Sequence, residues 1–162
     1  MIAQIRRARV AAVAAASAFA VGAIGGALTQ IGPWYRALKK PAWTPPDLAF
    51  PIIWTTILTL TAIAGALGWR ASTTPRARSA VIGLFAVNGA LNALWSLLFF
   101  TLKKPSLALV EAGALWLSIA ALIALLVARS RPAAALLLPY LAWVAVAFYL
   151  NAEIVRLNPA LS

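Results

Sequence analysis

Five long apolar runs, separated by short segments that carry basic residues, constrain the fold of this chain more than any other feature of its sequence. The runs cover about residues 8–30, 45–70, 80–102, 105–128 and 132–157. A helix needs about 20 apolar residues to cross the hydrocarbon core of a bilayer. We therefore predict an all-α membrane protein in which residues 1–162 form a single domain, a bundle of five transmembrane helices.

The composition supports lipid rather than water as the surroundings of these helices. Hydrophobic residues make up 64% of the chain and charged residues only 10%, whereas a soluble domain is about half apolar and about a quarter charged. The net charge of +11 comes from 14 basic and three acidic residues. Because the basic residues lie between the apolar runs, where membrane proteins place their anchors, we expect a lipid bilayer as partner and no nucleic acid.

The first apolar run follows Arg6, Arg7 and Arg9, and a basic start of this kind also occurs in cleaved signal peptides. The run is about 20 residues long, whereas the apolar core of a signal peptide has roughly 7–15. We therefore favour a retained helix. Basic residues are slightly more frequent on the side of the N-terminus than on the other, which favours a cytoplasmic N-terminus.

Prolines predict where several helices begin or bend. Thr44 is expected to cap the second helix, with Pro45 at its first position and Asp47 in its first turn. Pro139 is expected to kink the fifth helix. Residues 30–46, before the second helix, are rich in proline and aromatic residues and predict a loop at the membrane interface.

Cysteine and histidine are both absent from the chain. Their absence excludes disulfides, thiol nucleophiles, Cys/His zinc sites and histidine acid–base chemistry. We therefore predict no metal site and no catalytic residue, and we favour a binding protein over an enzyme.

Polar and aromatic residues recur at helical spacing within three of the runs. Asn88, Asn92 and Trp95 share one face of the third helix, and Trp54 belongs to an aromatic stripe on the second. The fifth helix carries a stripe at spacings of three, four and four, formed by Tyr140, Trp143, Ala147 and Asn151. Stripes of this kind mark either interhelical packing and hydrogen bonds or, where they converge, a pocket for a flat hydrophobic molecule.

Two further features allow more than one interpretation. Glu111 lies within the fourth run, and its carboxylate is expected to pair with Lys103 or Lys104, to bond a neighbouring helix, or to contact a ligand. Small residues on the third helix (Ala86, Gly89, Ala90 and Ala93) suit close helix packing, either between two copies of the chain or within one bundle.

The sequence also resembles a known family in several segments. These are GPWY at 32–35, KPAWTPP at 40–46, FPIIW at 50–54, NGALNALWSLLFF at 88–100, PYLAW at 139–143, LN at 150–151 and RLN at 156–158. They resemble, in the same order, the signature of the TspO/translocator protein family, which includes bacterial tryptophan-rich sensory proteins and the peripheral-type benzodiazepine receptor. The resemblance covers nearly the whole chain.

That resemblance implies a five-helix bundle, commonly a homodimer, in a bacterial membrane, which binds porphyrins such as protoporphyrin IX as ligand and requires no cofactor. It implies that Trp54, Trp143, Ala147 and Asn151 contribute to the pocket, that Trp34 and Tyr35 cover it, and that Asn88 and Asn92 form its polar floor. Glu111 falls where relatives often carry Asp. The cholesterol motif is not matched, because Tyr149 and Arg156 are too far apart.

The chemistry of the chain narrows the kind of porphyrin that we expect. Haem is usually held by His, Cys, Met or Tyr, and here the only Met is Met1, so a metal-free porphyrin fits better. Its carboxylates would find Arg36, Lys39 or Lys40 at the membrane surface. Sensing or transport of the porphyrin is the leading expectation. Light-dependent breakdown of the porphyrin and transport of a small solute are the alternatives.

Overall fold

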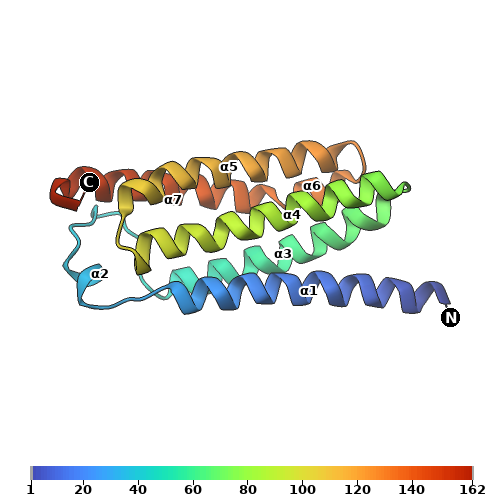
Figure 1. Cartoon of the computed structure of the whole chain (residues 1–162), viewed down its shortest axis with the longest axis horizontal. Coiled ribbons are helices and arrows are strands. Elements are labelled where there is room, and N and C mark those ends of the chain that lie inside the picture. Colours follow the sequence, from blue (N-terminus) through green and yellow to red (C-terminus); the bar gives the residue numbers. More distant parts are fainter. Residues whose placement is uncertain (1, 162) are drawn as a thin grey trace.

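The computed structural model describes residues 2–161 of the chain, and the described part is built from helices alone. Five long helices lie side by side with the N-terminus and the C-terminus at opposite ends of the bundle, as Figure 1 shows. The elements in chain order are α1 (Ile2–Leu28), α2 (Pro33–Ala37), α3 (Ala49–Ala71), α4 (Pro75–Ser96), a π-helical turn (Leu97–Thr101), α5 (Pro105–Val127), α6 (Arg131–Ala135), α7 (Leu138–Leu157) and a 3₁₀ turn (Pro159–Leu161).

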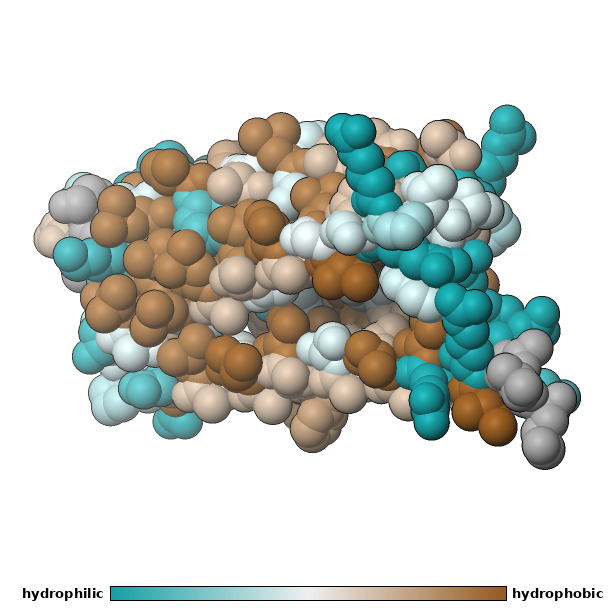
Figure 2. All heavy atoms as spheres, turned by 45° about the vertical axis from the view of Figure 1, so that its right-hand side comes forward, coloured by the Kyte–Doolittle hydropathy of each residue, from teal (hydrophilic) through white to brown (hydrophobic). Residues whose placement is uncertain are grey.

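Five segments of the described chain are long and apolar enough to cross a membrane, which confirms the predicted fold class. They are Gln4–Leu28, Ala49–Ala71, Pro75–Thr101, Pro105–Val127 and Arg131–Leu157. Apolar side chains cover the middle of the face shown in Figure 2, and hydrophilic side chains gather towards its right-hand end. This distribution is the one that a bilayer requires, with the polar groups at the membrane surfaces.

The predicted start of the second span is wrong. The helix α3 begins at Ala49 rather than at residue 45, and its first residue is preceded by Leu48 without a side-chain cap. The Thr44 hydroxyl donates instead to the carbonyl oxygen of Pro41 at 2.7 Å, which stabilises a turn in the loop. Asp47 therefore lies outside the helix.

The third span also begins earlier than expected, at Pro75 instead of residue 80. Thr74 caps it, because the Thr74 hydroxyl accepts a hydrogen bond from the backbone N–H of Ala77 at 3.1 Å. At its other end the span continues as the π-helical turn Leu97–Thr101. Lys103 then reverses the chain with a φ of 54°.

Pro139 interrupts the fifth span as predicted, and the interruption is a break rather than a gentle kink. The short helix α6 ends at Ala135 and α7 begins at Leu138, so that Pro139 falls in the first turn of α7. Backbone N–H groups in the first turn of a helix have no partner within the helix, so the N–H that proline lacks is not needed there. The break lies at the same end of the bundle as the N-terminus of α1 (Figure 1).

The densest packing surrounds α5, which contacts α4, α6 and α7. Ile119, Leu122 and Leu126 on α5 are completely buried. In contrast, α1 packs on α3 and α4 at the edge of the bundle through small residues. A Cβ atom at Gly22 would lie 2.7 Å from a Leu58 methyl group, and one at Gly89 would lie 2.9 Å from a Val21 methyl group. Gly89 therefore serves packing within one bundle, whereas packing of the third helix between two copies of the chain stays a prediction.

Candidate ligand-binding site

A cavity of about 980 Å³ lies between the helices at the end that carries α2, and the exposed side chains of Phe19 and Leu48 line its open side. All five long helices contribute to its walls. We call it the aromatic cavity, and six of the residues predicted from the sequence line it: Tyr35, Trp54, Asn92, Trp95, Trp143 and Ala147. The volume falls in the range of roughly 300–1,000 Å³ that is usual for small-molecule sites.

Aromatic rings form much of the wall, and their neighbours hold them in place. The Trp143 ring meets Phe50 edge to face at 5.8 Å between ring centres, and Trp54 meets Tyr140 in the same way at 6.0 Å. Trp95 stacks on Phe99 at 5.1 Å. Edge-to-face and stacked pairs are the favoured arrangements of aromatic rings, so each tryptophan presents a fixed flat surface.

The loop before α3 covers this end of the cavity. Its helix α2 places Tyr35 against Phe100, with 5.5 Å between ring centres, and Tyr35 is buried. The Nζ atom of Lys40 lies 3.7 Å from the centre of the Tyr35 ring, which is a cation–π contact. The side chain of Trp34 packs edge to face on Phe99 at 5.9 Å and does not line the cavity.

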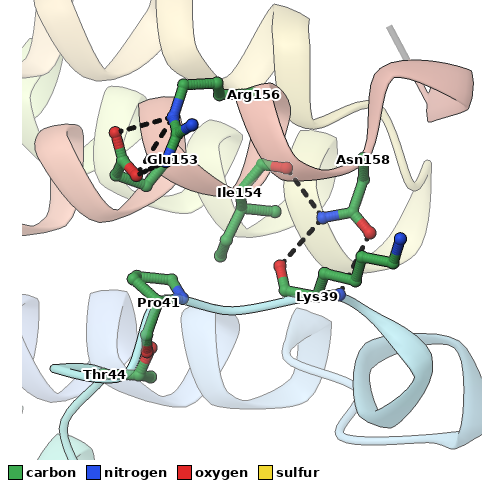
Figure 3. A network of polar contacts seen from close by, with 7 residues as sticks. All are labelled: Lys39, Pro41, Thr44, Glu153, Ile154, Arg156 and Asn158. Atoms are coloured by element: carbon green, nitrogen blue, oxygen red, sulfur yellow. Dashed lines mark hydrogen bonds and ion pairs between the residues drawn. The ribbon is translucent and has the colours of Figure 1, made fainter.

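A single side chain anchors the loop to the end of α7 (Figure 3). The backbone N–H of Lys39 donates to Oδ1 of Asn158 at 3.0 Å, and Nδ2 of Asn158 donates to the carbonyl oxygens of Lys39 at 2.9 Å and Ile154 at 2.8 Å. The amide of Asn158 therefore pairs with the loop backbone as a neighbouring strand would. This contact joins residues that are 119 positions apart in the chain.

Charges are unevenly distributed around the rim of the cavity. Asp47 lines it, whereas Arg36 and Lys39 are exposed outside it and Lys40 lies over Tyr35. Burial, and then the nearby Asp47 carboxylate, raise the pKa of the Tyr35 phenol above its ordinary value of 10.0. Tyr35 is therefore neutral at physiological pH and can donate a hydrogen bond.

The two predicted asparagines of α4 form hydrogen bonds between helices. Nδ2 of Asn88 donates to Oγ of Ser118 on α5 at 2.8 Å, and Nδ2 of Asn92 donates to the Tyr140 hydroxyl on α7 at 3.0 Å. Asn92 also lines the aromatic cavity, but Asn88 and Tyr140 do not. The polar residues thus fix the positions of α4, α5 and α7 beneath the cavity, and one amide reaches the cavity itself.

Asn151 is completely enclosed between α7 and the start of α5, away from the cavity lining. With its amide oriented so that both atoms are paired, Nδ2 donates to the carbonyl oxygen of Pro105 at 3.2 Å and Oδ1 accepts from the N–H of Leu109 at 2.9 Å. The residue therefore holds the first turn of α5. Its spacing on the stripe of α7 could not distinguish this position from one facing the cavity.

Glu111 is buried, and neither of its carboxylate oxygens has a partner among the described residues. The ion pair expected with Lys103 or Lys104 does not form, because both lysines are exposed in the turn while Glu111 faces the interior. Glu111 does not line the aromatic cavity either. No three acidic side chains of the described chain gather where they could hold a metal ion.

Several residues of the cavity were not predicted from the sequence. Asp47 and Phe100 line it, and so do Gly22, Gly25 and Gly26 of α1. Small residues in a transmembrane helix indicate close approach of a neighbouring helix, so the glycines of α1 predict a contact. They do not predict whether the space beside each glycine is filled by a side chain or left open.

Two indole N–H groups remain without an acceptor at the cavity wall. Nε1 of Trp95 and Nε1 of Trp143 are buried and have no hydrogen-bond partner among the described residues. A buried donor without a partner costs about 1–3 kcal/mol.

A bundle of five membrane-spanning helices around a cavity with aromatic walls defines an integral membrane protein with a candidate small-molecule site. Comparison with known proteins identifies the family. The TspO/MBR family model matches residues 12–157, and the chain belongs to this family.

Individual relatives agree with that assignment. The chain is 39% identical over 146 residues to the tryptophan-rich protein TspO of Chlorobaculum tepidum, covering 86% of this chain and 90% of the relative. It is 39% identical over 137 residues to the protein CrtK of Rhodobacter capsulatus, covering 83% and 84%. It is 38% identical over 120 residues to the translocator protein of Bos taurus, covering 73% and 70%. The chain is thus a membrane sensor or translocator protein by family, and its bacterial relatives support a bacterial membrane as its location.

Proposed function

We propose that this protein binds a porphyrin such as protoporphyrin IX in the aromatic cavity and acts as a porphyrin sensor or carrier. The observation that carries the proposal is a cavity of about 980 Å³ that Trp54, Trp95, Trp143 and Tyr35 line. Flat aromatic surfaces favour a flat aromatic guest through offset and edge-to-face contacts.

The charges near the cavity suit the carboxylates of a porphyrin. Lys40 lies against Tyr35 at the cover, and Arg36 and Lys39 are exposed on the same loop. A porphyrin whose ring lies between the tryptophans places its carboxylates at the membrane surface, where basic side chains can form charge-assisted hydrogen bonds. Asp47 at the rim opposes an anion, so the basic residues of the loop must outweigh it.

A porphyrin without a tightly ligated metal fits the residues best. The chain has no His or Cys, and its only Met is Met1. Of the tyrosines, only Tyr35 lines the aromatic cavity, and burial together with Asp47 opposes formation of its phenolate. The site therefore lacks the strong axial donor that haem usually takes.

Titration of the purified protein in neutral detergent with protoporphyrin IX tests the proposal. Quenching of tryptophan emission and a shift of the porphyrin absorbance are expected at micromolar ligand. The substitution Trp143→Phe should weaken the affinity roughly 2- to 10-fold, the equivalent of one aromatic contact. Trp116→Phe is the matched control, because Trp116 lies on α5 and does not line the cavity. Absence of quenching in the unsubstituted protein, or equal affinities for the Trp143 variant, would contradict the proposal.

A second arm tests the carboxylate contacts separately. Lys40→Gln should weaken binding of protoporphyrin IX and leave binding of its dimethyl ester unchanged, because the ester has no charge for Lys40 to meet. Lys103→Gln is the control. It removes the same charge from the turn between α4 and α5 at this membrane surface, and it should change the affinity for neither the acid nor the ester. Equal losses for the acid and the ester would show that Lys40 acts through the packing of Tyr35 alone.

A further inference from the structure

A second cavity, of about 720 Å³, lies between α1, α3 and α4 towards the N-terminal end of the bundle. Most of its wall is aliphatic or small, including Val13, Ile24, Gly65 and Ala86, and the predicted site residues Asn88 and Tyr140 also line it. It shares only Ala18, Val21 and Leu58 with the aromatic cavity. The proposed porphyrin function therefore leaves this second space unexplained.

This second cavity opens sideways towards the surrounding lipid. Val13, Ile24 and Ile82 line it and are 67%, 51% and 58% exposed. Figure 2 shows a hollow near the middle of this face, between the lowest row of side chains and those above it. Side chains of this kind on a transmembrane helix face hydrocarbon, so the contents of the cavity are in exchange with acyl chains rather than with water.

Three arginines gather at the end of this cavity that lies near the membrane surface. Arg9 lines the cavity. The guanidinium carbons of Arg6 and Arg78 lie 5.7 Å and 4.5 Å from the centre of the Trp69 ring, which is also part of the wall. Nε of Arg78 donates to the carbonyl oxygen of Ser72 at 3.0 Å, which fixes its position. We call this group the arginine cluster.

No acidic side chain of the protein balances the arginine cluster. The chain has only three acids. Glu153 pairs with Arg156, Asp47 lines the aromatic cavity at the opposite end, and Glu111 is buried in the first half of α5, which starts at that same opposite end. An anion that neutralises the arginine cluster must therefore come from outside the chain. A phosphate meets arginine with charge-assisted, often bidentate, hydrogen bonds.

We propose that this second cavity and the arginine cluster together form a binding site for one anionic phospholipid of the adjacent leaflet. One acyl chain fills the apolar cavity, and the lipid phosphate lies at Arg9 and Arg6. A membrane phospholipid is the occupant because the cavity opens to the bilayer, where such lipids are concentrated, and because a two-chain lipid can leave its second chain in the surrounding hydrocarbon. Clusters of basic residues beside transmembrane helices bind anionic lipid head groups for the same electrostatic reason.

The test uses the full chain in nanodiscs of phosphatidylcholine that contain a minor fraction of a lipid with brominated acyl chains. Bromine quenches tryptophan emission on contact, and the contribution of Trp69 is the difference between each protein and the same protein with Trp69→Phe. Brominated phosphatidylglycerol should quench Trp69 several-fold more than brominated phosphatidylcholine at the same fraction. Equal quenching by the two head groups would overturn the proposal.

Two pairs of variants separate the head group from the acyl chain. Arg6→Gln with Arg9→Gln should abolish the preference for phosphatidylglycerol, whereas Arg7→Gln with Arg76→Gln, which removes the same charge from exposed positions outside the cavity, should retain it. Gly65→Leu fills the cavity, since a Cβ there makes only ordinary contacts with the Phe85 ring, and should reduce quenching by both lipids. Gly83→Leu, which meets nothing within 4 Å, is its control. A preference that survives the first double substitution would also overturn the proposal, and no arm depends on porphyrin binding.

Discussion

The helices α1 and α5 have similar lengths and similar apolar character, but they are packed very differently. In the most apolar stretch of each helix, 39% of the residues of α5 are buried inside the bundle, against 6% of those of α1. Leucine and isoleucine side chains of α5 fill the core. The half-buried residues of α1, which face the bundle, include several alanines and glycines.

This difference explains where the protein keeps its empty space. Residues of α1 line both cavities, and neither cavity is formed only by α5 and α7. Small residues let two backbones approach closely at a few points, such as Gly22, and leave room between those points. The tightly packed half of the bundle thus supplies a fixed frame, and the loosely packed half supplies space for ligands.

The largest effect should come from a cavity made in the tightly packed half. Leu122→Ala removes a completely buried side chain of α5 and should lower the free energy of unfolding by about 2–5 kcal/mol. The matched change on α1 is Ile24→Ala, at a side chain that is 51% exposed, and should cost about 0.5 kcal/mol or less. Thermal unfolding of both variants in one detergent gives the comparison. Equal losses would show that α1 is as well packed as α5.

A smaller effect is expected where α1 touches α3. Gly22→Val should destabilise the protein by about 1–3 kcal/mol, because the added atoms meet the Leu58 methyl group. The same substitution at Gly26, where a Cβ would meet nothing within 4 Å, should be much milder. Combining Gly22→Val with Leu58→Ala should recover part of the loss. If the losses in unfolding free energy of the two single variants simply added up in the double variant, the clash between position 22 and Leu58 would not be the cause of the destabilisation.

The anchor of the loop should affect ligand release more than stability. Asn158→Ala removes three hydrogen bonds that hold Lys39 and Ile154, and the two bonds to Lys39 are exposed, so water replaces them at little net cost in stability. We expect dissociation of bound protoporphyrin IX to become faster, roughly 2- to 10-fold, because the cover opens more often. Stopped-flow displacement measures that rate. Glu153→Gln, which alters only the exposed ion pair beside the anchor in Figure 3, should leave the rate unchanged.

The smallest expected effect concerns the ionisation of Tyr35. Its pKa is raised by burial and by Asp47, so its phenol should titrate above 10.0, and Asp47→Asn should lower that pKa without restoring the ordinary value. Absorbance near the phenolate band, compared with a Tyr35→Phe variant, isolates the group. Because the folded state holds this proton more tightly, its contribution to stability is complete below pH 10 and is lost as the pH rises through the folded pKa. A rise of the Tyr35 pKa in the Asp47 variant would contradict this account.

The sequence predicted the spans well because the bilayer imposes a single requirement on them, a long apolar stretch without exposed polar backbone. It also predicted the interruption at Pro139, because proline lacks the N–H that a helix interior needs. The start of α3 was misplaced because Thr44, Pro45 and Asp47 carry an N-terminal signature that the folded loop uses for a turn instead.

The aromatic cavity was predictable only in part. Helical spacing placed Trp54, Asn92 and Trp143 on inward faces, and all three line the cavity. The same spacing placed Asn151 on the stripe of α7, and the structure puts it against the backbone of α5. Spacing along one helix fixes a direction, but which neighbour lies in that direction depends on how the helices pack.

Leu58 stands between the two cavities and is half-buried in the wall of both. A ligand that selects one rotamer of this side chain selects it for both compartments at once. The two occupants are then linked by a free energy that must be the same in both directions: whatever lipid does to porphyrin affinity, porphyrin does to lipid affinity by the same factor. If both proposed sites are occupied, the anionic lipid content of the membrane would therefore change the affinity of the protein for porphyrin.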